Sequence, residues 1–114
     1  YDITHGEGLA IIAPHWMRHV LNERTQERIV KFGVNVFGLA ADQAPSEIAE
    51  QTIARTAQFF KSLGMPMTLR EVGIDDSRLE EMAHHIAVNE GLDAPGTFAP
   101  LNEQDILSIL KAAL

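Results

Sequence analysis

Residues 6–21 read GEGLAIIAPHWMRHVL, and the spacing of their apolar side chains indicates the class of fold. The larger apolar residues recur at steps of three and four, which places them on one face of an α-helix. This face consists of Leu9, Ile12, Ala13, Trp16, Met17 and Val20. Pro14 lies inside the pattern, and because its ring clashes with the preceding turn we expect the helix to bend there.

The same helical period continues along the rest of the chain, without the alternation typical of a half-buried strand. Gly38 and Gly64 suit helix ends, Pro45 suits a first helical position, and Asp75 and Asn102 suit N-caps. Further helices are expected over about residues 25–37 and 45–63, between Asp75 and Gly91, and after Asn102. The sequence therefore predicts an all-α fold, a compact array of about five helices that forms a single domain over residues 1–114.

Each later helix has an apolar face that we expect to be buried. For residues 25–37 this face is Ile29, Phe32, Gly33, Val36 and Phe37, and for residues 45–63 it is Ala49, Ile53, Ala57, Phe60 and Leu63. For the last two helices the faces are Leu79, Met82, Ala83 and Ile86, and Ile106, Ile109, Leu110 and Ala113.

The composition excludes several classes of protein. The 114 residues carry 16 acidic and 9 basic side chains, and glutamates interleave with the basic residues between positions 18 and 31, so no basic stripe for nucleic acid is visible. The chain has no Cys and therefore no disulfide or thiolate site. It has no apolar run near the roughly 20 residues that span a membrane and no basic segment typical of a signal peptide. We expect a cytoplasmic protein with neither a nucleic-acid nor a membrane partner.

His5 is the candidate metal ligand, because it lies four residues before Leu9 at the start of the first helix. The positive end of a helix favours the neutral imidazole, which is the form that binds metals. The same dipole opposes a cation, so a metal would need a carboxylate and at least three ligands in all. Asp2 and Glu7 are too close in sequence to converge on the same point. From spacing alone, an ordinary buried histidine is the other interpretation.

His15 and His19 lie four residues apart on one helix and share a face, a spacing that can bind zinc. Trp16 follows His15 where the H-E-x-x-H zinc motif has its glutamate, and no acidic partner is evident. We therefore interpret both histidines as exposed polar residues. His84 and His85 are consecutive and diverge, so we assign them no role.

Three stretches together resemble a known family. THGEGLA at 4–10, followed by PHWM at 14–17, resembles the His-Gly segment of iron-containing (group III) alcohol dehydrogenases, in their butanol dehydrogenase-like branch. LGMP at 63–66 and LREVGI at 69–74 resemble a second segment of that family. Phe98 and residues 101–110 resemble its closing helix. The resemblance covers essentially the whole chain, in order.

The resemblance implies that the chain is the C-terminal part of the helical, metal-binding domain of a two-domain, NAD(P)-dependent oxidoreductase. In that family one Asp and three His hold a divalent metal, usually iron and sometimes zinc, and His5 matches the last of these ligands. The other ligands and the nucleotide loop would precede residue 1. The implied partner is thus the N-terminal portion of the same enzyme, and the fragment alone is expected to be inert, without tight binding of metal or NAD(P).

In the intact enzyme the resemblance implies that the metal acts as a Lewis acid on a small alcohol or aldehyde, with hydride exchanged with the nicotinamide. Members of the family often form dimers or larger assemblies, so a homo-oligomer is also implied. We further expect the side of the first helix that bears His5 to be more exposed and apolar than in a self-contained domain.

Two alternatives remain at this point. The acidic balance and the absence of Cys are compatible with a free-standing helical interaction or regulatory module that performs no catalysis. A helical zinc site at His15 and His19 would need acidic partners that the sequence does not identify.

Overall fold

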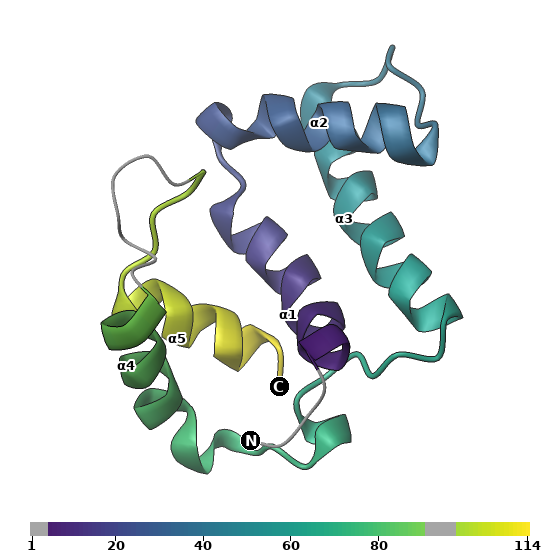
Figure 1. The fold of residues 1–114 in the computed structure, drawn as a ribbon. Helices are drawn as coiled ribbons and strands as arrows, with labels where there is room; N and C mark the ends of the chain where they lie inside the picture. Colours follow the sequence, from purple (N-terminus) through teal and green to yellow (C-terminus); the bar gives the residue numbers. More distant parts are fainter. Residues whose placement is uncertain (1–4, 91–97) are drawn as a thin grey trace.

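Every regular element of the chain is helical in the computed structural model, which describes residues 5–90 and 98–114 apart from the side chains of His5 and Glu90 (Figure 1). The elements are α1 (His5–Val20), α2 (Glu23–Phe37), α3 (Pro45–Ser62), the short 3-10 turns η1 (Arg70–Val72) and η2 (Asp76–Arg78), α4 (Leu79–Glu90) and α5 (Glu103–Ala112). The all-α fold with five helices is thus confirmed for the described residues. The end expected for the fourth helix at Gly91 lies outside them.

Helix α2 begins two residues earlier than the sequence predicted, because Asn22 caps it. Asn22 Oδ1 accepts hydrogen bonds from the backbone N–H groups of Arg24 and Thr25, at 2.8 and 3.0 Å. Thr25 Oγ1 in turn accepts from the Asn22 N–H at 3.0 Å. This reciprocal capping box satisfies donors that the first turn of a helix leaves without partners. The helix ends as expected at Gly38, whose φ of 68° is left-handed.

Helix α5 agrees closely with its sequence. Asn102 caps it, and the two hydrogen bonds between Asn102 and Asp105 are each 2.9 Å long. Leu101 and Ile106, on either side of the cap, are both buried, as in a hydrophobic staple. Every residue of the face predicted for this helix is at most 5% exposed; these residues are Ile106, Ile109, Leu110 and Ala113.

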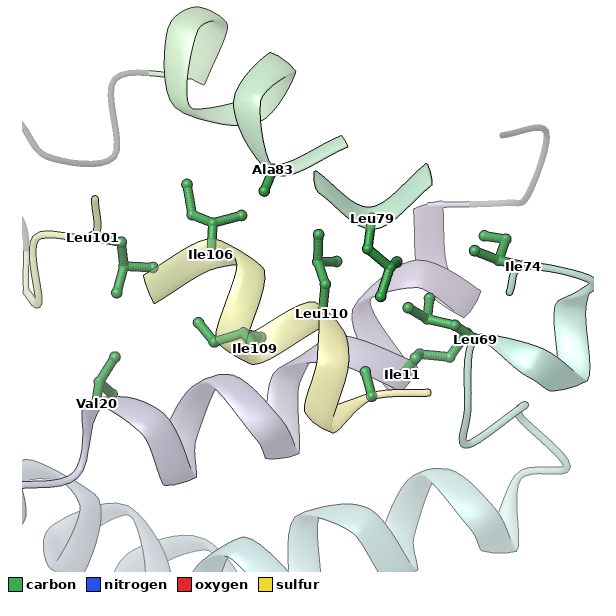
Figure 2. Packing of buried hydrophobic residues seen from close by; sticks show 11 residues of the cluster. Ile11, Val20, Leu69, Ile74, Leu79, Ala83, Leu101, Ile106, Ile109 and Leu110 are labelled. Carbon is green, nitrogen blue, oxygen red and sulfur yellow. The ribbon is translucent and has the colours of Figure 1, made fainter. Parts of the chain in front are cut away.

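The larger core cluster lies where α5 packs against α1 and α4 (Figure 2). It buries the following residues: Ile11, Val20, Leu69, Ile74, Leu79, Ala83, Leu101, Ile106, Ile109, Leu110 and Ala113. The backbone N–H of Leu69 donates to the carbonyl of Ala113 at 2.8 Å, which ties the end of the chain to the connection before η1. The irregular stretch 67–74 thus reaches the core through Leu69.

The smaller cluster lies on the other side of α1 and has only four buried residues, which are Met17, Ile29, Ala49 and Ile53. Here α2 crosses α3 closely at Gly33. A Cβ added at Gly33 would overlap Thr52 Oγ1 and lie 3.1 Å from Thr52 Cβ. Arg18 Nη1 and Glu50 Oε2, 2.7 Å apart, join α1 to α3 at the surface.

The buried faces of α1, α2 and α3 differ from the sequence prediction at four residues. Leu9, Phe32, Val36 and Leu63 were expected to be buried but are 51%, 41%, 61% and 60% exposed. Each of these residues belongs to an apolar helix face, and the neighbouring described helices cover only part of that face. Helix α1 instead turns Ala10, Ile11 and Pro14 inward. Figure 1 shows the first turn of α1 almost end-on while its later turns run obliquely, which agrees with the bend expected from Pro14.

Candidate functional site

His5, the predicted metal ligand, is the first residue of α1. Its backbone therefore occupies the helix end that carries the positive partial charge. Its side chain lies outside the described part of the structure. The turn that follows is close to the α3–η1 connection, since a Cβ added at Gly6 would lie 3.8 Å from Met65 Cε.

The face of α1 that is reached from His5 in steps of three and four residues is partly exposed. Leu9, one turn along, is 51% exposed, and Ile12, Ala13 and Trp16 are only half-buried. Only the N-terminal part of this face is open, because Met17 and Val20, which belong to the same predicted face, are buried. The described chain covers the opposite side, at Ala10, Ile11 and Pro14.

The described side chains do not form a complete metal site by themselves. Among residues 6–89 and 98–114, no group of three or more His, Asp or Glu side chains is arranged to hold a metal ion. The ligand set therefore does not fit a metal within this part of the chain. A metal at His5 would have to take its other ligands from outside it.

The predicted alternative, a zinc site at His15 and His19, is not supported. Burial and, to a smaller extent, the nearby charge of Arg18 lower the pKa of His15, which is half-buried. His19 Nε2 instead lies 3.0 Å from Asp105 Oδ1 on α5. His19 thus has a carboxylate partner, but no third ligand joins it among the described residues.

Sequence reasoning did not find two hydrogen bonds between histidines and the first turn of α5. Besides the His19–Asp105 pair, His84 Nδ1 on α4 lies 2.8 Å from Glu103 Oε1. The backbone N–H of Asn102 and, next, the His19 side chain lower the pKa of Asp105. The partners are 86 and 19 residues apart, so no local spacing could have indicated them. They fasten α5 to its neighbours and form no catalytic arrangement.

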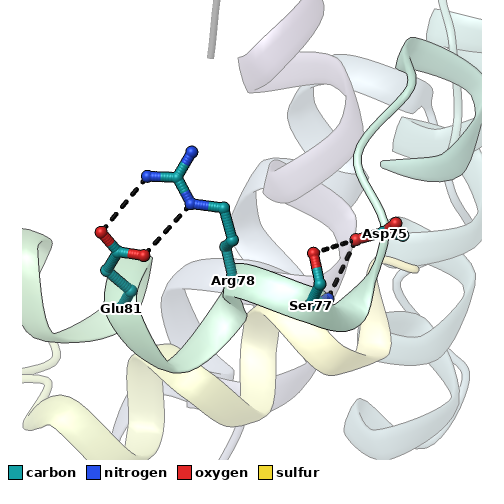
Figure 3. Close-up of polar contacts among 4 residues, drawn as sticks. All are labelled: Asp75, Ser77, Arg78 and Glu81. Atoms are coloured by element: carbon teal, nitrogen blue, oxygen red, sulfur yellow. Dashed lines mark hydrogen bonds and ion pairs between the residues drawn. The ribbon is translucent and has the colours of Figure 1, made fainter.

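The acidic residues Asp75 and Glu81, on either side of the start of α4, are also structural (Figure 3). Asp75 was expected to cap α4 directly, but it caps the short turn η2, which leads into α4. Hydrogen bonds from the side chain and backbone N–H of Ser77 lower the pKa of Asp75. Arg78 donates to both carboxylate oxygens of Glu81, at 3.1 and 3.2 Å, and lowers the pKa of Glu81. These exposed carboxylates are therefore engaged in local contacts.

Comparison with known proteins identifies the family. The model for the Fe-containing alcohol dehydrogenase family, C-terminal, matches residues 1–114. This chain belongs to that family. The resemblance read from the His-Gly segment and the later motifs is therefore confirmed, as is the similarity to butanol dehydrogenases.

Relatives in the family are alcohol dehydrogenases. The chain is 45% identical over 111 residues to NADH-dependent butanol dehydrogenase A of Clostridium acetobutylicum, covering 97% of this chain and 28% of that protein. It is 41% identical to probable NADH-dependent butanol dehydrogenase 1 of Bacillus subtilis, covering 100% of this chain and 29% of the relative. The crystal structure of NADH-dependent butanol dehydrogenase A from Thermotoga maritima matches with a TM-score of 0.82 and 28% identity, over 99% of this chain and 29% of that one.

The chain thus spans under a third of the length of these relatives. Its helical fold is similar to the matched part of the Thermotoga maritima structure. No described helix is long and apolar enough to cross a membrane.

Proposed function

We propose that this chain is the helical part of a metal-dependent, NAD(P)-linked alcohol dehydrogenase of the cytoplasm and that His5 is one of its metal ligands. The observation that carries the proposal is the family match over residues 1–114, together with 45% identity to a butanol dehydrogenase. The divalent metal, iron or zinc, would supply Lewis-acid chemistry at the oxygen of a small alcohol or aldehyde that exchanges hydride with the nicotinamide.

The position of His5 supports its proposed role. His5 is the first residue of α1, and the positive end of a helix favours neutral imidazole, which is the form that binds metals. The described residues contain no complete ligand set, so the remaining ligands and the nucleotide site would come from the rest of a longer polypeptide. The chain alone is accordingly proposed to be inert, and the intact enzyme to be a homo-oligomer.

The experiment uses a chimaera in which residues 1–114 replace the matching region of the Clostridium acetobutylicum enzyme. We expect the purified chimaera to retain bound metal and to oxidise NADH with butyraldehyde. The His5→Ala variant should lose both properties, because one ligand is removed. The control is His85→Ala, since His85 is exposed on α4 and bonds only to Asn89 among the described residues.

Two results would contradict the proposal. One is a His5→Ala chimaera that keeps its metal content and its rate. The other is turnover by the 114-residue chain alone, with ferrous ion, NADH and butyraldehyde, above that of its own His5→Ala variant. No observation in the described structure favours the alternative of a free-standing regulatory module.

A further inference from the structure

The described helices other than α1 form two pairs that lie on either side of it. Helix α2 packs closely on α3 and α4 packs closely on α5, whereas α1 contacts α3 on one side and α5 on the other. Figure 1 shows α1 between the two pairs. Within residues 5–90 and 98–114, no close packing joins a helix of one pair directly to a helix of the other. The placement of the two pairs therefore depends on α1 and on the segments that link the helices.

The two pairs are held to α1 by cores of different size. The cluster that α1 shares with α4 and α5 buries eleven residues, whereas the cluster that it shares with α2 and α3 buries four. A smaller buried apolar surface gives a smaller free energy of local opening. The α2–α3 pair is thus the part of the described fold that we expect to open more easily.

Residues 98–101, which we call the strap, connect the larger cluster to α2. Leu101 is buried in that cluster, and Phe98 and Ala99 pack against it. The strap also lies beside α2, because Arg24 Nη2 donates to the carbonyl of Phe98 at 3.5 Å. In Figure 1 this yellow-green segment rises from the start of α5 toward the start of α2. The strap therefore reaches from one helix pair to the other.

The ring of Phe98 contacts α1 and α2 at one point. Its centre lies 6.0 Å from that of Trp16, a residue of α1 that packs against both clusters. The Arg28 guanidinium carbon lies 5.6 Å from the centre of the Phe98 ring, within the range of a cation–π contact. Neither Arg24 nor Arg28 has an ion-pair partner among the described residues. Their printed contacts across the fold are thus with Phe98.

We propose that Phe98 is a latch that makes the two helix pairs open as a single unit. With its ring against Trp16 and Arg28, α2 cannot leave α1 without also breaking contacts of the strap, which is anchored in the larger cluster through Leu101. Once the ring is released, the α2–α3 pair opens by itself, because only the smaller cluster and the contacts of α3 with α1 hold it. The latch is a conformational device of the fold and does not depend on the proposed catalytic role.

Hydrogen–deuterium exchange of the backbone amides, measured by mass spectrometry of peptides from the 114-residue chain, tests the latch. The reporting peptides contain Ile29 and Ile53 for the α2–α3 pair, and Ala83 and Ile109 for the α4–α5 pair, because all four residues are buried. Each exchange rate is divided by the rate of the same peptide in the unfolded chain. The ratio then measures the opening of the helix pair that carries the peptide.

In the parent chain we expect the protection of the two pairs to agree within about threefold, because the latch couples their opening. In Phe98→Ala the α2–α3 peptides should exchange at least about tenfold faster than the α4–α5 peptides. Phe59→Ala is the aromatic control and should not separate the pairs, since Phe59 is 52% exposed and its ring pairs with Phe60 on the same helix. Equal acceleration of both pairs in Phe98→Ala would overturn the inference, because Phe98 would then only support the fold in general. A difference of about tenfold already present in the parent would also overturn it.

Two exposed cations on α2 allow a second test that leaves the core unchanged. Arg28→Gln removes the contact with the Phe98 ring, and Lys31→Gln is the matched control, because Lys31 is an exposed cation one turn further along α2. We expect Arg28→Gln to speed the exchange of the α2–α3 peptides about two- to fivefold and Lys31→Gln to leave it unchanged. In a Phe98→Leu background Arg28→Gln should have no effect, because the ring is absent. Equal effects of the two substitutions, or an effect of Arg28→Gln that persists without the ring, would overturn the inference.

The chimaera with the Clostridium acetobutylicum enzyme serves if the 114-residue chain has no slowly exchanging amides of its own. The same peptides are then measured in the chimaera, and the same differences between the two helix pairs are expected. Their absence from the chimaera would overturn the inference in that case.

Discussion

The crossing of α2 over α3 at Gly33 gives a sharp prediction about stability. Gly33 is buried in the middle of α2, and a Cβ added there would overlap Thr52 Oγ1 and crowd both Thr52 Cβ and Leu39 Cδ1 at 3.1 Å. Thr52 cannot simply turn away, because its hydroxyl donates to the carbonyl of Ile48 at 2.7 Å. We therefore expect Gly33→Ala to push the two helices apart.

Two effects of opposite sign determine the size of the change. Alanine is favoured over glycine inside a helix by about 1 kcal/mol. Overpacking a tight contact costs about 1–3 kcal/mol, and the rigid, hydrogen-bonded Thr52 places this site at the upper end. The net loss in the free energy of unfolding is about 2 kcal/mol, which lowers the melting temperature by roughly 8 °C for a domain of this length.

Thermal unfolding followed by far-ultraviolet circular dichroism measures this loss. Gly6→Ala is the control, because Gly6 is also helical but a Cβ there meets only Met65 Cε at an ordinary 3.8 Å. This variant should be as stable as the parent or gain up to about 1 kcal/mol. Adding Thr52→Ala to Gly33→Ala removes the overlapping oxygen and should recover at least half of the loss. A Gly33→Ala chain that melts at or above the parent temperature would refute the reasoning, as would the absence of any rescue.

Three further predictions concern polar contacts. Asn102→Ala removes the capping box of α5 and should cost about 1 kcal/mol in urea unfolding at neutral pH, whereas an unchanged midpoint would show that the cap contributes nothing. The pKa of Asp105 is lowered on folding, so its stabilisation is complete above the unfolded value near pH 4 and is lost as the pH falls through the folded value. Asp105→Asn should therefore lose less stability than the parent between pH 7 and pH 3, and an equal loss in both would contradict this. Arg18→Ala breaks the exposed ion pair with Glu50 and should lower the free energy of unfolding by at most about 1 kcal/mol. A double-mutant cycle with Glu50→Ala measures the coupling energy of the pair, which should disappear at high salt.

The sequence predicted helix ends correctly where they depend on interactions between residues close in the chain. The end of α2 at Gly38, the start of α3 at Pro45 and the cap of α5 at Asn102 all depend on residues within one turn. The face of α5 was also predicted in full, because this short helix is enclosed by α1 and α4. Helix α2 begins two residues before the predicted start at 25, because the Asn22 side chain caps its first turn.

The buried faces of the first three helices could not be predicted as reliably. Periodicity identifies an apolar stripe, but the part of that stripe that is covered depends on where the neighbouring helices lie. Leu9, Phe32 and Val36 continue apolar stripes and yet are 51%, 41% and 61% exposed, because the described helices cover only part of each stripe. The sequence contains no signal for this difference, because an uncovered edge is a property of the packing.

The sequence by itself determined the helical class, most of the helix ends and, through its motifs, the family and the candidate ligand His5. These depend on contacts between residues a few positions apart or on matches along the chain. Only the tertiary structure decided that His19 meets Asp105 across 86 residues, that α2 crosses α3 at Gly33 and Thr52, and that the Phe98 ring lies against Arg28. Such contacts form only after whole helices have packed, because packing sets which side chains of distant segments lie within a few ångströms of each other.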